Sequence, residues 1–304
     1  MPTVTIVSGT PRPPDGGRPS AWHWYDVWRR MAEDPGEYRT GSLRVLRPDQ
    51  KADFTVVVNH PGSPLGADSW THALDRTVLI QLEPYAVHRG KWGAWTDPAF
   101  HGRLRFAHTI ATRHMGIDWA VGYNRPDLYE HRPEKTRACS AVLSWKTHHP
   151  GHKLRMRLVR EHLTRAPWFD LYGTICRDGE PPHPRWLGAL PTRQKQDALD
   201  PYMYHLCVEN SQQSNYWTEK LTDALLCECL PLYWGCPNLP DFLPEDCVIP
   251  LPLDNPGHAA AMMEEISSSP IYWHARIGAV REARRLILDR YNVWSVLARE
   301  LGDG

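Results

Sequence analysis

Short apolar runs alternate with polar and helix-like stretches along the whole of this 304-residue chain. The runs of strand length in the first half are 3–9, 53–59, 76–83, 118–124 and 139–145. Those in the second half are 169–173, 203–208, 230–235 and 246–251. Strands that alternate with helices are typical of α/β folds with parallel sheets. We therefore expect two Rossmann-like domains, residues 1–145 and 146–304, and the chain is long enough to bury two cores.

Apolar residues recur at helical spacing in the last long segment, residues 271–301. They are Ile277, Val280, Leu286 and Leu297. This spacing predicts a long helical segment that packs along or between the domains.

Polar residues follow the apolar run 203–208, which suits a strand buried in a parallel sheet. They are Glu209, Asn210 and Ser211. Because ligands of open α/β sheets bind at the carboxyl ends of strands, we expect these residues to line a binding site. The alternative is that Asn210 only closes a turn.

A helix is expected after this loop, with Ser214 or Asn215 as its N-cap and Thr218, Glu219 and Lys220 in its first turn. The free N–H groups and the helix dipole favour an anion there, by roughly 0.3–1 kcal/mol at an exposed site. Lys220 adds a full positive charge, so the pattern predicts a diphosphate site. The alternative is that Glu219 and Lys220 form a solvated surface pair.

An ordered series of motifs surrounds these residues. It consists of V-E-N-S at Val208–Ser211, Y-x-T-E-K-L at Tyr216–Leu221, P-x-Y-W-G at Pro231–Gly235 and D-F-x-P at Asp241–Pro244. The series resembles the α-1,3/4-fucosyltransferase family, glycosyltransferase family 10, in its bacterial type. The resemblance implies the GT-B architecture, in which two Rossmann-like domains face each other across a cleft. It also implies an enzyme that transfers L-fucose from GDP-fucose to a sugar hydroxyl with inversion.

The donor-binding residues that follow from the motifs and the resemblance are Arg155, Glu209, Asn210, Ser211, Tyr216, Thr218, Glu219 and Lys220. Arg155 opens the segment that resembles the family's R-x-R-L motif, whose arginine lies against the donor's diphosphate. A guanidinium suits this role through its planar fork of donors. The alternative is that Arg155, Arg157 and Arg160 form the solvent face of an amphipathic helix.

Transfer with inversion also needs a carboxylate that takes the proton of the acceptor hydroxyl. The run 76–83 ends at Glu83, and the family places a glutamate at the end of an equivalent strand, so Glu83 is the candidate catalytic base. This chain lacks the residue that the family has between the glutamate and the following proline. Asp97 and Asp118 are the alternative bases.

Aromatic and metal-binding residues complete the candidates. Trp92 and Trp95 are candidate acceptor-stacking residues, because flat sugar faces pack on indole rings. Trp217 replaces the small aliphatic residue common in the family's motif. The seven cysteines suggest core packing rather than a disulfide framework. A histidine cluster, His148, His149 and His152, fits a polar loop better than a metal site.

No Asp-x-Asp motif occurs, so we expect no metal or other cofactor, and Lys220, Arg155 and the helix terminus would neutralise the departing diphosphate. The formal net charge of zero gives no indication of a nucleic-acid partner. The partners expected are a nucleotide-sugar donor and a glycan or other hydroxyl acceptor.

No apolar run approaches the 18 or so residues that a membrane span needs, and the start of the chain lacks a signal peptide pattern. A cytoplasmic location is therefore expected. The arginines of residues 271–301 suggest a weak alternative, peripheral contact with the inner face of a membrane through this segment.

Two alternatives to a fucosyltransferase stay open. The first keeps the fold but uses another nucleotide sugar or a non-glycan acceptor. The second is a non-catalytic protein that binds glycans or nucleotides and has lost the base.

Overall fold

The computed structural model describes residues 1–8, 20–60, 72–82, 93–109, 116–175, 182–191 and 194–302. They form two compact units. The first contains Met1–Ile117, Asn124–Pro126 and Leu288–Gly304, and the second contains Asp118–Tyr123 and Asp127–Ile287. The division differs from the expected boundary after residue 145, because the strand at 137–142 pairs within the second sheet and the last helix packs in the first unit.

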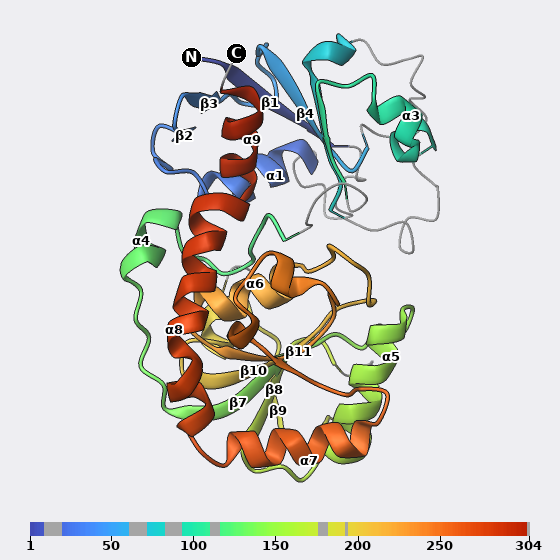
Figure 1. Ribbon diagram of the computed structural model, residues 1–304, viewed down its shortest axis with the longest axis vertical. Helices are drawn as coiled ribbons and strands as arrows, with labels where there is room; N and C mark the ends of the chain where they lie inside the picture. Colours follow the sequence, from blue (N-terminus) through green and yellow to red (C-terminus); the bar gives the residue numbers. More distant parts are fainter. Residues whose placement is uncertain are drawn as a thin grey trace. The chain divides into compact units, whose positions relative to one another are not determined.

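The first unit is built on a sheet of six strands in the order β2-β3-β1-β4-β5-β6. The strands are β1 (Thr3–Ser8), β2 (Arg39–Thr40), β3 (Leu43–Val45), β4 (Phe54–Val58), β5 (Thr77–Ile80) and β6 (Phe106–His108) (Figure 1). All neighbours are parallel except β2 and β3. The five parallel strands follow the 2-1-3-4-5 order of doubly wound folds.

The strands expected at 3–9, 53–59 and 76–83 are confirmed, but the one at 118–124 is wrong. The backbone N–H groups of Ala120 and Val121 donate to the carboxylate of Asp223 instead of to a strand. This segment therefore has the apolar pattern of a strand, but its backbone N–H groups donate to a side chain instead of to a neighbouring strand.

The helices in the described part of the first unit are α1 (Ser20–Arg29), α3 (Pro98–His101) and α9 (Val293–Leu301). The helix α4 (Arg125–Glu130) begins in the first unit and continues in the second. Trp294 of α9 is fully buried and donates its indole N–H to the carbonyl of Trp28 at 2.7 Å. The two rings meet edge to face, 5.9 Å apart. The end of the chain therefore completes the core of the first unit.

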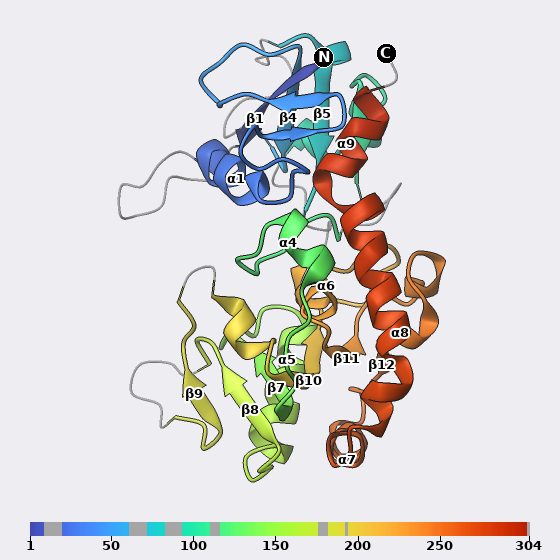
Figure 2. The same cartoon turned by 90° about the vertical axis from the view of Figure 1, so that its left-hand side faces the viewer.

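The second unit contains a fully parallel sheet in the order β12-β11-β10-β7-β8-β9. Its strands are β7 (Arg137–Val142), β8 (Phe169–Tyr172), β9 (Trp186–Gly188), β10 (Tyr202–Val208), β11 (Leu230–Trp234) and β12 (Ile249–Pro250). Figure 2 shows them in this order from β9 at the left to β12 at the right. The order reverses between β7 and β10, which are neighbours, and doubly wound sheets bind ligands beyond the carboxyl ends of such a pair.

The helices of the second unit are α5 (Pro150–Arg157), α6 (Glu219–Leu226), α7 (Pro256–Ser267) and α8 (Ile271–Leu286). A π-helical turn, Leu158–His162, continues α5. Short 3-10 helices occupy Leu74–Arg76, Gly93–Thr96, Lys195–Ala198, Leu239–Asp241 and Glu245–Cys247. Among the described residues, none of the helices combines the length and the apolar character that a bilayer crossing requires.

The expected long helix at 271–301 consists of separate parts. A second π-helical turn, Ile287–Tyr291, follows α8, and the side chain of Asn292 then caps α9 by accepting from Trp294 N and Ser295 N. The helical spacing across the segment is correct, but α8 belongs to the second unit and α9 to the first.

A buried carboxylate holds α8 in the second unit. Glu228 is almost fully buried and accepts from Arg281 at 2.9 and 3.0 Å, and Arg284 lies 3.0 Å away. The carboxylate of Glu282 is half exposed and pairs with Arg285 on the same helix. Both glutamates therefore form ion pairs with arginines of α8, but the Glu228 carboxylate is buried and the Glu282 carboxylate is half exposed.

We expect Glu228→Ala to lower the free energy of unfolding of the second unit by about 3–5 kcal/mol, because it leaves the buried guanidinium of Arg284 without its carboxylate partner. Glu282→Ala is the control and should cost about 0–1 kcal/mol. Urea unfolding monitored by tryptophan fluorescence measures both. Equal effects of the two substitutions would show that the Glu228 pairs do not hold α8.

Candidate functional site

The candidate site lies at the carboxyl ends of β7 and β10, where the strand order of the second sheet reverses. Glu209 directly follows β10 and is fully buried. Its N–H donates to the carbonyl of Trp234 at 2.9 Å, so its backbone continues the pairing of β10 with β11. The polar residues expected at this strand end are therefore at the ligand-binding edge of the sheet.

The helix α6 begins later than expected, with Thr218 as its N-cap. Asn215 has a left-handed backbone with φ of 66°, and its N–H donates to Asn238 Oδ1 at 2.8 Å. Thr218 Oγ1 instead accepts from the N–H of Lys220. Ser214 and Asn215 are thus part of the preceding loop, and the expectation that one of them caps the helix is wrong.

The carboxylate of Glu209 holds the start of this helix through two hydrogen bonds. The N–H of Thr218 donates to Glu209 Oε1 and its hydroxyl donates to Glu209 Oε2, both at 2.8 Å. Burial raises the pKa of the Glu209 carboxyl, and Lys220 and the Thr218 hydrogen bonds oppose this. Both carboxylate oxygens are therefore used in positioning α6.

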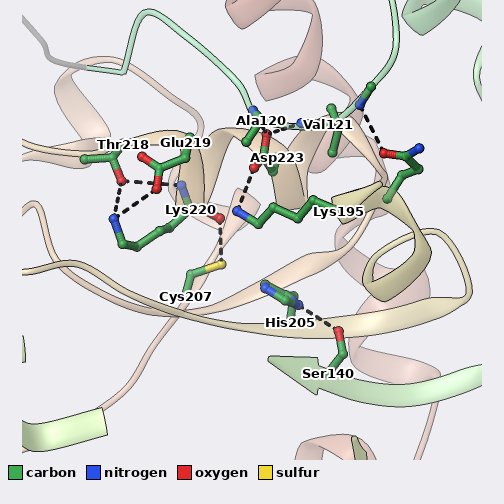
Figure 3. Close-up of polar contacts among 12 residues, drawn as sticks. Ala120, Val121, Ser140, Lys195, His205, Cys207, Thr218, Glu219, Lys220 and Asp223 are labelled. Carbon is green, nitrogen blue, oxygen red and sulfur yellow. Dashed lines mark hydrogen bonds and ion pairs between the residues drawn. The ribbon is translucent and has the colours of Figure 1, made fainter. Parts of the chain in front are cut away.

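Lys220 connects the charged groups of the first turn (Figure 3). Its Nζ lies 3.0 Å from Thr218 Oγ1, 3.2 Å from Glu219 Oε1 and 3.6 Å from Glu209 Oε2. Burial lowers the pKa of Lys220, but the nearby Glu219 and Glu209 outweigh it and raise the pKa overall. The Lys220 side chain is 22% exposed, so this is no ordinary solvated surface pair.

Glu219 stays ionised in this environment. Burial acts to raise its pKa, but Lys220 and then Lys195 lower it to about 2. The site therefore keeps a carboxylate and an ammonium side by side at the positive end of α6.

Arg155 is the second cation of the site and is buried, with 4% exposure. Its Nη2 donates to Ser144 Oγ at 3.3 Å, while its Nε has no hydrogen-bond partner among the described residues. Burial lowers its pKa to about 10, against the effect of Glu209 and Glu219. A buried guanidinium with an unused donor is suited to an anionic ligand.

The neighbouring arginines of this helical segment lie on its solvent side. Arg157 is 57% exposed and pairs with Glu161 at 3.2 Å, and Arg160 is also exposed. The amphipathic-surface alternative therefore holds for Arg157 and Arg160 but not for Arg155.

Further candidates lie around this pair of cations. Asn210 Oδ1 and Ser211 Oγ are buried polar atoms with no partner in hydrogen-bonding geometry among the described residues. Tyr216 is fully buried and close enough to Arg155 to influence its pKa. Trp217 is also fully buried and packs on Phe242, 4.8 Å between ring centres.

Two glycines leave the space that Glu209 needs. A Cβ on Gly151 would lie 1.8 Å from the carbonyl oxygen of Glu209, and one on Gly235 would lie 2.5 Å from Glu209 Cγ and 2.4 Å from Tyr233 Oη. The N–H of Gly151 also donates to the carbonyl of Asn210 at 3.0 Å. The start of α5 and the end of β11 therefore approach Glu209 as closely as only glycine permits.

Sequence reasoning missed a second ion pair on α6, between Asp223 and Lys195, at 2.6 Å. Asp223 is fully buried. The signal was a single acidic residue in the apolar face of the helix, since such residues are rarely buried without a partner.

The site candidates of the first unit are less well placed. Glu83 and Trp92 lie outside the residues that the structure describes. Trp95 is in the core, where its ring packs edge to face on Phe100 at 5.0 Å, so it presents no exposed face for sugar stacking. Asp97 caps α3 by accepting from the N–H of Ala99.

The histidine cluster is not gathered around a common point. His148 is exposed, the rings of His149 and His152 are 5.0 Å apart, and burial lowers the pKa of His152 to about 4. Among the described residues, the side chains close enough to share a metal ion are those of His131, Asp200 and Cys227. His131 and the hydroxyl of Tyr123 already hydrogen-bond to Asp200, so the cluster has a structural explanation.

Comparison with known proteins identifies relatives of this part of the chain. Residues 132–270 match the family model described as glycosyltransferase family 10 (fucosyltransferase), C-terminal part. The alpha-(1,3)-fucosyltransferase FucT of Helicobacter pylori is 40% identical over 57 residues, which are 18% of this chain and only 12% of that relative. These matches confirm the resemblance drawn from the motifs.

Solved structures show the fold. The DNA-modifying enzyme beta-glucosyltransferase, solved in the presence and absence of uridine diphosphoglucose, has a TM-score of 0.55 at 9% identity and covers 99% of both chains. An alpha1,3-fucosyltransferase structure covers 91% of this chain and 81% of its own at 16% identity, with a TM-score of 0.48. The fold class expected from the sequence, α/β with two Rossmann-like units of GT-B type, is confirmed.

We expect Gly235→Ala and Gly151→Ala to displace Glu209 and to lower the melting temperature by several degrees or more, because the new methyl groups overlap backbone or buried atoms. Gly278→Ala is the matched control, since nothing lies within 4 Å of the new Cβ. In its helix the change should be stabilising, by up to about 1 kcal/mol. Differential scanning calorimetry decides, and unchanged melting of the Gly151 and Gly235 variants would contradict the close packing.

Proposed function

We propose that the protein transfers L-fucose from GDP-fucose to a sugar hydroxyl with inversion, in an α-1,3-type linkage, because residues 132–270 match the model of glycosyltransferase family 10 (fucosyltransferase). The observation that carries the proposal is the position of Arg155. Its buried guanidinium has an unused Nε donor and lies in the same electrostatic environment as the first turn of α6.

The donor's diphosphate would be held by the side chains of Arg155 and Lys220 at the positive end of α6. Asn210 and Ser211 offer buried polar atoms for hydroxyl groups of the donor. Glu209 has both oxygens on Thr218, so in this proposal it orients the helix start rather than touching the sugar. Glu219 keeps its charge and would face the donor as a carboxylate.

The reaction is a displacement at the anomeric carbon. The acceptor oxygen forms a bond to that carbon while the bond to the phosphate oxygen of GDP breaks. The acceptor proton moves to a carboxylate, for which Glu83 is the proposed base. The negative charge that develops on the departing diphosphate falls on Lys220 and Arg155, so we propose that no metal cofactor is required.

Other readings differ in what they predict for binding. A protein that uses another nucleotide sugar would keep the anion site but prefer a nucleotide other than GDP. A non-catalytic protein would keep the anion site but show no turnover.

The described contacts give membrane binding through residues 271–301 little support, because Arg276 pairs with Asp246, Arg285 pairs with Glu282, and Arg281 and Arg284 bind Glu228.

We expect GDP at 100 times its dissociation constant to stabilise the protein by about 2.7 kcal/mol, and UDP, dTDP and CMP to do so less. Arg155→Ala should weaken GDP binding by roughly tenfold or more, because it removes a charge-assisted donor worth about 1.5–3 kcal/mol. Arg157→Ala is the matched control and should bind like the unchanged protein. Thermal shift and calorimetry, each with and without a chelator, measure these effects.

The outcomes separate the alternatives. Stabilisation by another nucleotide instead of GDP would show that the donor is not GDP-fucose. Equal effects of Arg155→Ala and Arg157→Ala on GDP binding would show that Arg155 does not bind the donor. Loss of binding in the chelator would contradict the metal-free proposal.

We expect Glu83→Gln to lower kcat by about 10²–10⁴-fold and to leave GDP affinity unchanged, because the amide cannot accept the acceptor's proton. Turnover is measured as GDP release from GDP-fucose with a panel of glycan acceptors. Full activity of this variant would transfer the role of base to another carboxylate, with Asp97→Asn and Asp118→Asn as the next substitutions.

A further inference from the structure

A second anchored carboxylate lies on α6, one turn beyond Glu219 (Figure 3). Asp223 Oδ1 accepts from the N–H groups of Ala120 at 2.7 Å and Val121 at 3.2 Å. Its Oδ2 accepts from Lys195 Nζ at 2.6 Å. Because Asp223 is fully buried, these donors fix both the carboxylate and the ammonium that it binds.

Lys195 reaches this helix from a different part of the chain, the 3-10 helix Lys195–Ala198 that precedes β10. Its side chain is 16% exposed. Burial lowers its pKa, but Asp223 and then Glu219 outweigh burial and raise it. Lys195 in turn lowers the pKa of Glu219, second only to Lys220 among the nearby cations. The two lysines whose charges act on Glu219 therefore come from two segments of the chain.

The charges around Glu219 balance one for one before a ligand arrives. The groups concerned are the cations Arg155, Lys195 and Lys220 and the carboxylates Glu209, Glu219 and Asp223. A diphosphate adds negative charge to this set, so the loss of a cation makes its binding less favourable.

We propose that Lys195, anchored by Asp223 one turn along α6 from Glu219, is a further positioning residue of the donor site, whose ammonium attracts the Glu219 carboxylate and helps to balance the charge of the bound diphosphate. The role in diphosphate binding rests on the proposed function. The role at Glu219 concerns the protein alone.

The test compares the unchanged protein with Lys195→Gln and Lys195→Arg. The glutamine Nε2 can still donate to Asp223 Oδ2, and Ala120 and Val121 still donate to Asp223 Oδ1, so the carboxylate keeps hydrogen-bond donors while the charge at position 195 is lost. Lys195→Arg keeps both the charge and a donor to Asp223.

Two quantities are measured, the dissociation constant for GDP by calorimetry and the pKa of Glu219 by ¹³C NMR, with Glu219→Gln to assign the signal. We expect Lys195→Gln to bind GDP roughly tenfold more weakly than the unchanged protein, and its Glu219 to titrate at higher pH. The arginine variant should keep both values of the unchanged protein. An ion pair that serves only stability would give the same GDP affinity and the same Glu219 pKa in all three proteins, and that result overturns the proposal.

The NMR titration needs no ligand, which separates this proposal from the proposed function. If the unchanged protein does not bind GDP, the fucosyltransferase proposal fails. The Glu219 titration then decides by itself whether the charge of Lys195 acts on that carboxylate.

Discussion

The hydrogen bonds between Glu209 and Thr218 determine where the helix α6 begins, and the candidate site depends on that point. A carboxylate buried without partners is costly, so its two oxygens impose a strict geometry on the N–H and hydroxyl of Thr218. This geometry brings Lys220 and the positive end of the helix dipole to the strand end. Gly151 and Gly235 permit it, since larger residues would occupy the space of Glu209.

Burial acts on every charged group near this point, yet the groups respond differently because their neighbours differ. Burial raises the pKa of Glu209 despite the charge of Lys220 and the Thr218 hydrogen bonds, whereas the charges of Lys220 and Lys195 outweigh burial at Glu219 and lower its pKa. Burial lowers the pKa of Arg155, which forms no ion pair with a carboxylate in the part of the chain that the structure describes. The site thus combines a carboxylate, Glu209, whose hydrogen bonds hold the backbone at Thr218, with a guanidinium, Arg155, whose Nε has no hydrogen-bond partner among the described residues.

The sequence predicted much of the second unit and less of the first. Parallel strands such as β10 are buried on both faces, so their continuous apolar runs were visible, and the polar residues after β10 marked the ligand edge. The N-cap was misplaced because Ser214, Asn215 and Thr218 all have suitable side chains, and only the tertiary contact with Glu209 selects among them. The run 118–124 was misread because its backbone partners are side chains distant in sequence, which no local pattern records.

The division of the chain between the two units has a practical consequence for anyone who wishes to dissect or recombine them. The second unit includes Asp118–Tyr123 as well as Asp127–Ile287. The intervening Asn124–Pro126 and the final helix α9 belong to the first unit. An amino-terminal fragment that ended near the centre of the chain would therefore lack Trp294, which completes the core of the first unit. A carboxyl-terminal fragment that began at residue 127 would lack Ala120 and Val121, whose N–H groups donate to Asp223. Chimeras and circular permutants of this protein need junctions chosen by contact rather than by sequence midpoint, with the crossing segments carried along intact.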